Sequence, residues 1–299
     1  MGMSQSYGTA DWDESIATIH RALELGVSFI DTANVYGAGH NEVLVGRALY
    51  DRRDAVQLAT KLGIDNTAGW DNRVIRGKAG YVKQACEDSL LRLGVDVIDL
   101  YYLHRPPQDA EIEETVGAMG ELVGEGKVRH LGLSEVDETL LRRAYAVHPI
   151  AAVQSEYSLW TRDPETTVLA ALRELGVGLV PFSPLGRGFL TGTVDRSSFG
   201  AKDFRANNPR FVGDAGDANQ KIADAVAAVA ARHDVPAAQV ALAWVYGQSA
   251  RLGIPVVPIP GTKRVKWLEQ NAGALELELT EQDLAELDPL GAQVAGARY

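Results

Sequence analysis

The chain has 299 residues, of which 46% are hydrophobic and 23% are charged, and these proportions exclude an intrinsically disordered protein. Asp and Glu outnumber Lys and Arg by 40 to 29, and the net charge of -11 argues against nucleic acid and anionic membranes as partners. Cys86 is the only cysteine, so no internal disulfide can form, and the sequence shows neither a secretory leader nor a long apolar run. These features together predict a cytoplasmic protein.

Amphipathic stretches alternate along the chain with short runs rich in β-branched residues. The first helix is predicted over Asp13–Leu25, with Gly26 as its stop signal, and the strand Val27–Asp31 follows it. Each further strand follows a helical pattern, and the candidates are Val56–Lys61, Val97–His104, Val128–Ser134, Ala151–Gln154, Val177–Pro181 and Pro255–Pro258. Alternation of this kind predicts an α/β protein with a parallel sheet.

The placement of polar residues distinguishes a closed barrel from an open sheet. Asp31, Lys61, His104, Ser134 and Gln154 all fall at the C-terminal ends of predicted strands, as in a site assembled from every βα loop of a barrel. An open sheet would concentrate them at one switch point, and a Rossmann fold would carry a Gly-x-Gly-x-x-Gly turn after an early strand. We therefore predict one (β/α)8 TIM barrel domain over residues 1–299, lacking one strand at its N-terminus.

One irregular stretch, residues 186–217, is much longer than an ordinary connection. It carries Arg187, Lys202, Arg205 and Arg210, which suggests a cover for an anionic group.

Asp31, Tyr36, Lys61 and His104 form the constellation that best supports chemistry. Lys61 ends an apolar strand, so its ammonium is expected at the barrel mouth, paired with a carboxylate such as that of Asp31. An ammonium near Tyr36 should lower the pKa of the phenol from about 10 towards neutrality and make it a general acid. His104 can donate to an oxygen that develops negative charge. No side chain serves as the nucleophile, which suggests a hydride from a cofactor.

Seven ordered motifs resemble those of the aldo-keto reductase superfamily, most closely its perakine-reductase-like and pyridoxal-reductase-like branch. They extend over essentially the whole chain and read DTANVYG, LATKLG, IDLYYLHRP, GKVRHLGLSE, QSEYSLW, PFSPLGRGFLTG and IPGTKRVKWLEQN. The resemblance implies a (β/α)8 barrel that uses NADPH to reduce aldehydes or ketones to alcohols. It makes Tyr36 the proton donor, with Lys61 lowering its pKa, Asp31 holding Lys61 and His104 orienting the substrate carbonyl.

The resemblance also assigns residues to the cofactor. Ser134 and Gln154 would contact the nicotinamide carboxamide, and Phe182 would stack on the nicotinamide ring. The turn around the pyrophosphate matches Ser183, Leu185, Gly186, Arg187 and Gly188, with Arg187 adding charge. The segment around the adenosine 2'-phosphate matches Gly261, Thr262 and Lys263, and the pair at the adenine matches Gln270 and Asn271.

The basic run Lys263, Arg264 and Lys266 favours NADPH over NADH, because a 2'-phosphate attracts cations. The alternative is a solvated helix N-terminus.

The chain departs from the family pattern at its start. It opens at MGMSQSYG, the residues that would follow the family's first barrel strand and N-terminal hairpin, and Met1 matches a position beside the nicotinamide ribose. We expect a preceding segment to be missing rather than another element to fill the gap. A barrel lacking one strand exposes two edges.

Two other functions stay open at this point. The superfamily includes channel β-subunits that act as partners of a membrane protein, and an isomerase or aldolase on the same barrel would use Lys61 as a Schiff-base amine. The remaining histidines lack the paired spacing of metal ligands, so no metal is expected. The expected partner is a small carbonyl substrate, whose identity the sequence does not specify, and the sequence gives no indication of oligomeric state.

Overall fold

The computed structural model describes residues 1–6, 10–196, 199 and 203–298. Within them, six parallel strands form a curled sheet in chain order. The strands are β1 (Phe29–Asp31), β2 (Gln57–Leu62), β5 (Ile98–Leu103), β6 (Val128–Ser134), β7 (Ile150–Glu156) and β8 (Gly178–Phe182). The predicted strands therefore coincide with the observed ones to within about two residues at most ends.

The seventh predicted strand, Pro255–Pro258, is only partly formed. Leu179 N donates to Pro255 O at 2.8 Å and Val257 N donates to Leu179 O at 3.0 Å, so the segment runs beside β8 in the parallel sense. Its pairing with β8 amounts to a single bridge between Leu179 and Val256. Ile259 N also donates to Pro181 O at 3.0 Å, but Pro181 of β8 has no backbone N–H to donate in return, which explains the interrupted ladder.

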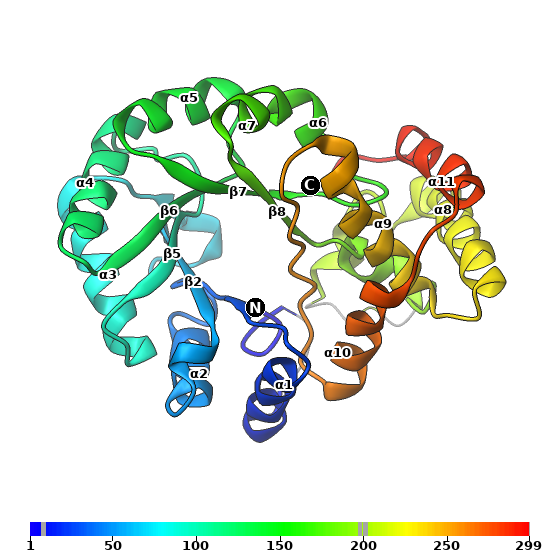
Figure 1. Ribbon diagram of the computed structural model, residues 1–299, viewed down its shortest axis with the longest axis horizontal. Helices are drawn as coiled ribbons and strands as arrows, with labels where there is room; N and C mark the ends of the chain where they lie inside the picture. The colour runs from blue at the N-terminus through cyan, green and yellow to red at the C-terminus, as the bar shows by residue number, and fades with distance from the viewer. Residues whose placement is uncertain (7–9, 197–198, 200–202, 299) are drawn as a thin grey trace.

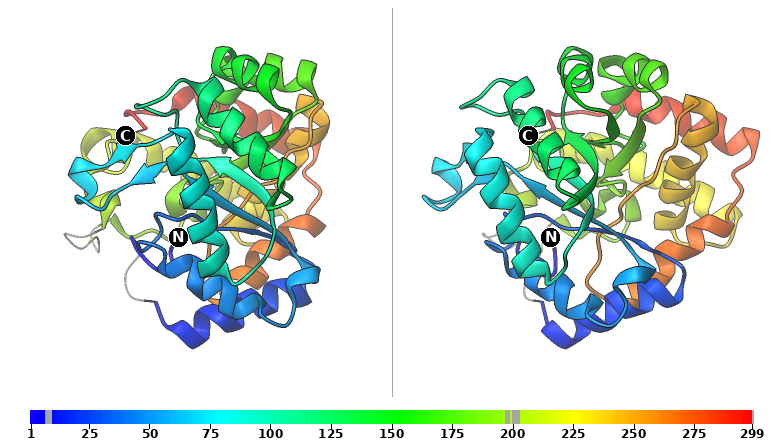
Figure 2. Two further views of the ribbon diagram at one scale, coloured as in Figure 1. Left: turned by 90° about the vertical axis from the view of Figure 1, so that its left-hand side faces the viewer. Right: turned by 60° about the vertical axis from the view of Figure 1, so that its left-hand side comes forward.

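Helices cover the outer face of the sheet, and the sheet curls around an inner space in which the N-terminus lies (Figures 1 and 2). Those between the strands are α1 (Trp12–Glu24), α2 (His40–Leu49), α3 (Ala79–Leu93), α4 (Ile112–Gly124), α5 (Glu138–Val147), α6 (Pro164–Thr167) and α7 (Leu169–Leu175). The later ones are α8 (Gly213–Arg232), α9 (Ala237–Leu252), α10 (Val265–Ala272) and α11 (Glu281–Leu287). Short 3-10 turns occupy Arg53–Ala55, Trp70–Asn72, Gly186–Thr191, Phe204–Asn207, Gly273–Glu276 and Asp288–Gln293.

Local sequence explains where the first helix begins and which face it buries. The side chain of Asp11 accepts from the backbone N–H of Glu14 at 2.8 Å and caps α1. Ile19 and Ala22 lie one turn apart on its buried face. At the other end Arg21 pairs with Glu269 of α10 at 2.8 Å, so α1 and α10 meet across the opening between β1 and the 255–259 segment.

The main hydrophobic core lies between the sheet and its helices, and a smaller cluster fills the inside of the curl. Ala59, Tyr102, Ala152 and Val180 form this inner cluster. A Cβ on Gly132 would lie 2.4 Å from the ring of Tyr102, so this glycine makes room for the tyrosine.

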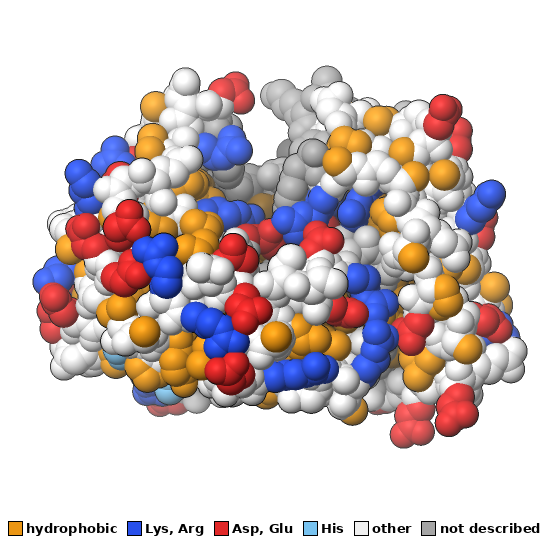
Figure 3. Space-filling model, turned by 90° about the horizontal axis from the view of Figure 1, so that it is seen from above, with side chains coloured by type: hydrophobic (Ala, Val, Ile, Leu, Met, Phe, Trp, Pro, Cys, Tyr) orange, Lys and Arg blue, Asp and Glu red, His pale blue; other side chains and the backbone are white. Residues whose placement is uncertain are grey.

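Sequence patterns did not reveal one element, the two-stranded antiparallel hairpin of β3 (Ile64–Asp65) and β4 (Val74–Ile75). It follows β2 directly. One face of the molecule intersperses basic and acidic side chains, without a large patch of one sign (Figure 3). None of the described helices combines the length and apolar character needed to cross a bilayer.

Candidate active site

Four polar side chains gather beyond the C-terminal ends of β1, β2 and β5. Asp31 is the last residue of β1, Lys61 lies near the end of β2, and His104 directly follows β5. Tyr36 lies in the turn after β1, where its N–H donates to Ala33 O at 3.1 Å. Because these strands are parallel and adjacent, their ends lie side by side. The four residues predicted as catalytic therefore lie together.

Lys61 is fixed from several sides. Its side chain has no exposed surface, forms an ion pair with Asp31 and donates to Thr32 O at 2.8 Å. The second carboxylate oxygen of Asp31 accepts from Gln154 Nε2 at 2.9 Å. The ammonium and its carboxylate are therefore both held in place by neighbouring strand ends, as a buried charge requires.

Tyr36 lies between this ammonium and His104. The Lys61 Nζ atom is 5.2 Å from the Tyr36 ring centroid. The rings of Tyr36 and His104 meet edge to face, with centroids 5.9 Å apart. The β3–β4 hairpin contributes Ile64 and Ile75 to an apolar cluster against the tyrosine. Tyr36 is half-buried, with an apolar wall on one side.

The pKa expected for Tyr36 is wrong in direction. Burial is the largest influence and raises the pKa of the phenol, while the ammonium of Lys61 lowers it by less, so the pKa ends above its ordinary value. Desolvation disfavours the phenolate, and Asp31 adds to that effect because it neutralises Lys61. At neutral pH Tyr36 consequently carries its proton.

Lys61 is charged, whereas His104 is neutral. Burial alone would lower the pKa of Lys61, but Asp31 and Tyr36 outweigh it and raise that pKa, so Lys61 is an ammonium. Burial lowers the pKa of His104 well below its usual value, and the charges of Lys61 and Arg105 lower it further. His104 is therefore a neutral imidazole. Its Nδ1 is buried without a hydrogen-bond partner among the described residues, which favours the tautomer with the proton on Nε2.

Ser134 and Gln154 pair with each other in register at the ends of β6 and β7. Both are almost fully buried, with 1% and 3% of their surface exposed. The amide of Gln154 is engaged with Asp31, and the hydroxyl of Ser134 accepts from Arg105 at 3.2 Å. This neighbouring amide and hydroxyl adjoin the catalytic residues.

A run of left-handed backbone follows β8, after the half-buried ring of Phe182. The φ angles of Ser183, Gly186, Arg187 and Gly188 are 50°, 56°, 58° and 94°. Gly186 N donates to Ser183 O at 2.9 Å, and Gly188 N donates to Leu185 O at 3.0 Å. A Cβ on Gly186 would lie 2.6 Å from the indole of Trp160, so this position also requires glycine for space. A run of left-handed residues can present backbone N–H groups to an anion, although those of Gly186 and Gly188 are already bonded within this turn.

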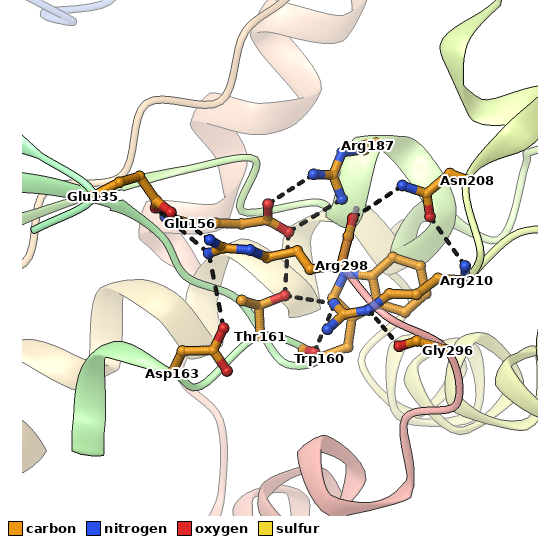
Figure 4. A network of polar contacts seen from close by, with 10 residues as sticks. All are labelled: Glu135, Glu156, Trp160, Thr161, Asp163, Arg187, Asn208, Arg210, Gly296 and Arg298. Carbon is orange, nitrogen blue, oxygen red and sulfur yellow. Dashed lines mark hydrogen bonds and ion pairs between the residues drawn. The ribbon is translucent and has the colours of Figure 1, made fainter. Parts of the chain in front are cut away.

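The side chain of Arg187 does not have the surroundings predicted for it. It is 3% exposed and forms an ion pair with Glu156 at 2.8 Å (Figure 4). The guanidinium charge is thus balanced inside the protein, by a carboxylate that the sequence analysis had not singled out.

The prediction that the 186–217 stretch covers an anion with its cations is also not matched by their contacts. Arg210 donates to Thr161 Oγ1 at 2.7 Å and to Trp160 O at 3.1 Å from within the protein (Figure 4). Arg205 pairs with Asp203 at 2.6 Å. Lys202 lies outside the described residues.

The predicted adenosine segment lies in the loop before α10 and in α10 itself, which contacts α1. Thr262 Oγ1 accepts from Arg264 N at 3.3 Å, while Gly261 is exposed and Lys263 partly so. Asn271 is buried on α10, and the carbonyl of Gln270 accepts from Gln239 at 2.9 Å. Lys266 lies over the ring of Trp267 at 4.7 Å. The basic run is therefore close to the helix N-terminus, where backbone N–H groups add positive potential.

Two further charged residues lie near these groups, and sequence reasoning missed the first of them. Arg105 directly follows His104 in the motif IDLYYLHRP, which was a signal that the search for catalytic residues passed over. Glu135 directly follows Ser134 with a φ of 54°, and its carboxylate accepts from Glu156 N at 2.8 Å and pairs with Arg298 (Figure 4).

Comparisons with known proteins agree with this geometry. The profile of the Aldo/keto reductase family matches residues 1–292. The chain belongs to the aldo/keto reductase family. It is 46% identical over 304 residues to a probable aldo-keto reductase 1 of Glycine max, with all of this chain and 86% of the relative aligned.

Solved structures of this family share the fold. The glycerol dehydrogenase of Gluconobacter oxydans is 29% identical, with a TM-score of 0.87 over 97% of this chain and 88% of its own. An aldo/keto reductase of Klebsiella pneumoniae, solved with NADP and acetate, is 28% identical, with a TM-score of 0.72 over 93% and 85% of the two chains. These similarities and the curled parallel sheet confirm the predicted α/β barrel class.

Proposed function

We propose that this aldo/keto reductase reduces aldehydes or ketones to alcohols with NADPH, and that Tyr36 is the proton donor. The observation that carries the proposal is the position of the Tyr36 phenol between the Lys61 ammonium and the neutral ring of His104. The Klebsiella pneumoniae relative solved with NADP supports the choice of cofactor.

The charge states of this chain's residues fit the reaction. Tyr36 holds its proton at neutral pH and gives it up only as negative charge develops on the carbonyl oxygen. Lys61 stays charged and stabilises the phenolate that the proton leaves behind, while Asp31 fixes the ammonium. The neutral His104 donates from Nε2 to the same carbonyl oxygen and orients it. NADPH, when bound, supplies the hydride.

The residues proposed to hold the cofactor fit its parts. Ser134 and Gln154 offer a hydroxyl and an amide beside the catalytic group, which suits a carboxamide, and Phe182 offers a ring face. The turn through Ser183, Leu185, Gly186, Arg187 and Gly188 offers backbone N–H groups to the pyrophosphate, a role that does not need the buried Arg187 side chain. We assign Gly261, Thr262 and Lys263 to the 2'-phosphate, and Gln270 and Asn271 to the adenine.

Lys61 does not suit the isomerase or aldolase alternative. A Schiff base requires an unprotonated amine that the substrate can reach, whereas Lys61 is fully buried, paired with Asp31 and raised in pKa. We further propose that residues 1–299 act as one barrel domain in the cytoplasm, without nucleic acid or membrane as partner.

Absorbance at the NADPH band tests the proposal with a panel of aldehydes and ketones. We expect NADPH oxidation that depends on the carbonyl substrate, and one equivalent of alcohol formed per NADPH consumed. NADPH binding without turnover of any carbonyl would support a binding function, as in the channel β-subunits, and would overturn the enzyme proposal.

A further inference from the structure

Arg105 lies among the residues proposed for catalysis and for the nicotinamide. Its Nη1 atom donates to His104 O at 2.6 Å and to Ser134 Oγ at 3.2 Å. Its guanidinium carbon lies 5.9 Å from the ring centroid of Phe182. The ends of β5, β6 and β8 therefore surround this side chain. Its positive charge acts to lower the pKa of both His104 and Tyr36.

The charge of Arg105 is not balanced by a carboxylate. Over residues 1–6, 10–196, 199 and 203–298, no Asp or Glu forms an ion pair with it, and Nε and Nη2 donate to no protein group. Other half-buried or buried arginines nearby do have acids, as Arg187 has Glu156 and Arg298 has Glu135. A half-buried guanidinium held only by two neutral oxygens retains its affinity for an anion.

The two unused N–H groups also have a suitable geometry. Nε and one Nη of a guanidinium form a planar fork that matches the two oxygens of a carboxylate. Because Arg105 is the immediate neighbour of His104, an anion held by this fork lies close to a carbonyl held by His104 and Tyr36.

We propose that Arg105 binds a carboxylate carried by the substrate, so that the preferred substrates are aldehydes or ketones with an acid group near the carbonyl. This inference rests on the proposed function and adds a substrate class to it. A phosphate offers similar oxygens, and the experiment includes it as a separate arm.

Steady-state kinetics with matched substrates test the inference. The first pair is 4-carboxybenzaldehyde and 4-formylbenzamide, which have the same shape but differ in charge, and the second is succinic semialdehyde and butanal. Glyceraldehyde 3-phosphate and glyceraldehyde form the phosphate arm. We expect kcat/KM to favour each carboxylate by roughly 10- to 100-fold, as a charge-assisted hydrogen bond allows, mostly through KM. A larger preference in the phosphate arm would overturn the choice of carboxylate.

The variants Arg105→Met and Arg105→Lys distinguish two roles of Arg105: binding the carboxylate of the substrate, and holding Ser134 in the cofactor site through its hydrogen bond. We expect Arg105→Met to lose the preference for the carboxylate, so that kcat/KM falls much more for 4-carboxybenzaldehyde than for 4-formylbenzamide, and Arg105→Lys to retain part of the preference. If Arg105→Met instead weakens NADPH binding and slows both substrates equally, Arg105 supports the cofactor site and the inference is wrong.

Calorimetry provides a readout that does not need turnover. Benzoate should bind the protein saturated with NADP+ more tightly than benzamide, and Arg105→Met should abolish the difference. Equal binding of the two would overturn the inference even if no aldehyde is reduced. Conversely, an enzyme that reduces neutral aldehydes without a preference for acids leaves the proposed function intact and rejects only the role of Arg105.

Discussion

The ammonium of Lys61 and the carboxylate of Asp31 form an ion pair that is almost closed to water, with side-chain exposures of 0% and 8%. The pair lies directly beside Tyr36, whose ring centroid is 5.2 Å from the ammonium nitrogen. The pair therefore has two roles. It is part of the buried interior of the sheet, and its ammonium is the positive charge next to the phenol.

Removing one partner of this pair should affect both stability and turnover. Lys61→Met leaves the carboxylate of Asp31 buried without its cation, and we expect a loss of about 3–5 kcal/mol in the free energy of unfolding. Turnover should fall as well, since the phenolate loses its stabilising charge. Urea unfolding and NADPH oxidation measure the two effects.

The double variant Lys61→Met with Asp31→Asn distinguishes the effect on stability from the effect on turnover. It removes both charges, so we expect much of the stability to return while turnover stays low. Turnover that recovers together with stability would show that Lys61 acts only through the fold.

Tyr36→Phe should abolish most turnover without altering cofactor binding. The substitution removes only the phenolic hydroxyl, and loss of a general acid lowers kcat by about 10²- to 10⁴-fold. NADPH fluorescence titration should give an unchanged Kd. Tyr50→Phe is the matched control, since this tyrosine is 85% exposed. A Tyr36→Phe enzyme with most of its activity would remove Tyr36 from the mechanism.

His104 should make the protein less stable as the pH falls below about 6.5. Burial, Lys61 and Arg105 place its pKa in the folded protein well below the ordinary value of 6.5. Between these two pKa values the unfolded chain binds a proton that the folded one does not, so stability declines with falling pH, by at most about 1.4 kcal/mol per pH unit.

Urea unfolding between pH 5 and 7 measures this slope. We expect His104→Gln to reduce it, because the amide has no proton to bind in this range. The control is His130→Gln, since His130 is exposed and should leave the slope unchanged. An equal slope in His104→Gln would assign the effect to another group, such as the Met1 amine, whose pKa is lowered to about 5 by burial.

Gly186→Ala should destabilise the turn after β8 both by backbone strain and by a steric clash of the new methyl group. Gly186 and Gly192 both have positive φ, at 56° and 68°, but only at Gly186 would a Cβ meet a neighbour, the indole of Trp160 at 2.6 Å. Trp160 is itself held by Phe189 and Phe211 and cannot give way easily.

The comparison with Gly192→Ala isolates that clash. We expect Gly192→Ala to lose about 1–2 kcal/mol of unfolding free energy from strain, and Gly186→Ala to lose about 1–3 kcal/mol more. Gly186→Ala should also weaken NADPH binding in a fluorescence titration. Equal losses in the two variants, with unchanged NADPH affinity, would mean that the turn tolerates the methyl group.

Strand ends could be predicted from the sequence because polar residues there interrupt continuous apolar runs. That signal located Asp31, Lys61, His104, Ser134 and Gln154, and parallel pairing brings such ends together whatever the details of packing. The short β3–β4 hairpin has two residues per strand, too few for any alternation to be detected.

Electrostatic surroundings could not be predicted, because they depend on residues distant in the sequence. Glu156 comes from β7 and forms an ion pair with Arg187, 31 residues later, and no local pattern in the sequence indicates this pairing. The pKa of Tyr36 was predicted from its cation alone, whereas burial is the larger influence. A sequence indicates which charges exist but not how much water surrounds each of them.

The contact between Arg21 of α1 and Glu269 of α10 joins segments that are 248 residues apart in the sequence. Neighbouring strands of the curled sheet are consecutive along the chain, whereas this α1–α10 seam closes a much longer loop. Closing the seam therefore costs the most chain entropy, and we expect it to form late in folding. The loop and helix assigned to the adenosine lie on the same seam. A nucleotide bound there would hold α1 and α10 together, and the melting temperature should rise with nucleotide concentration.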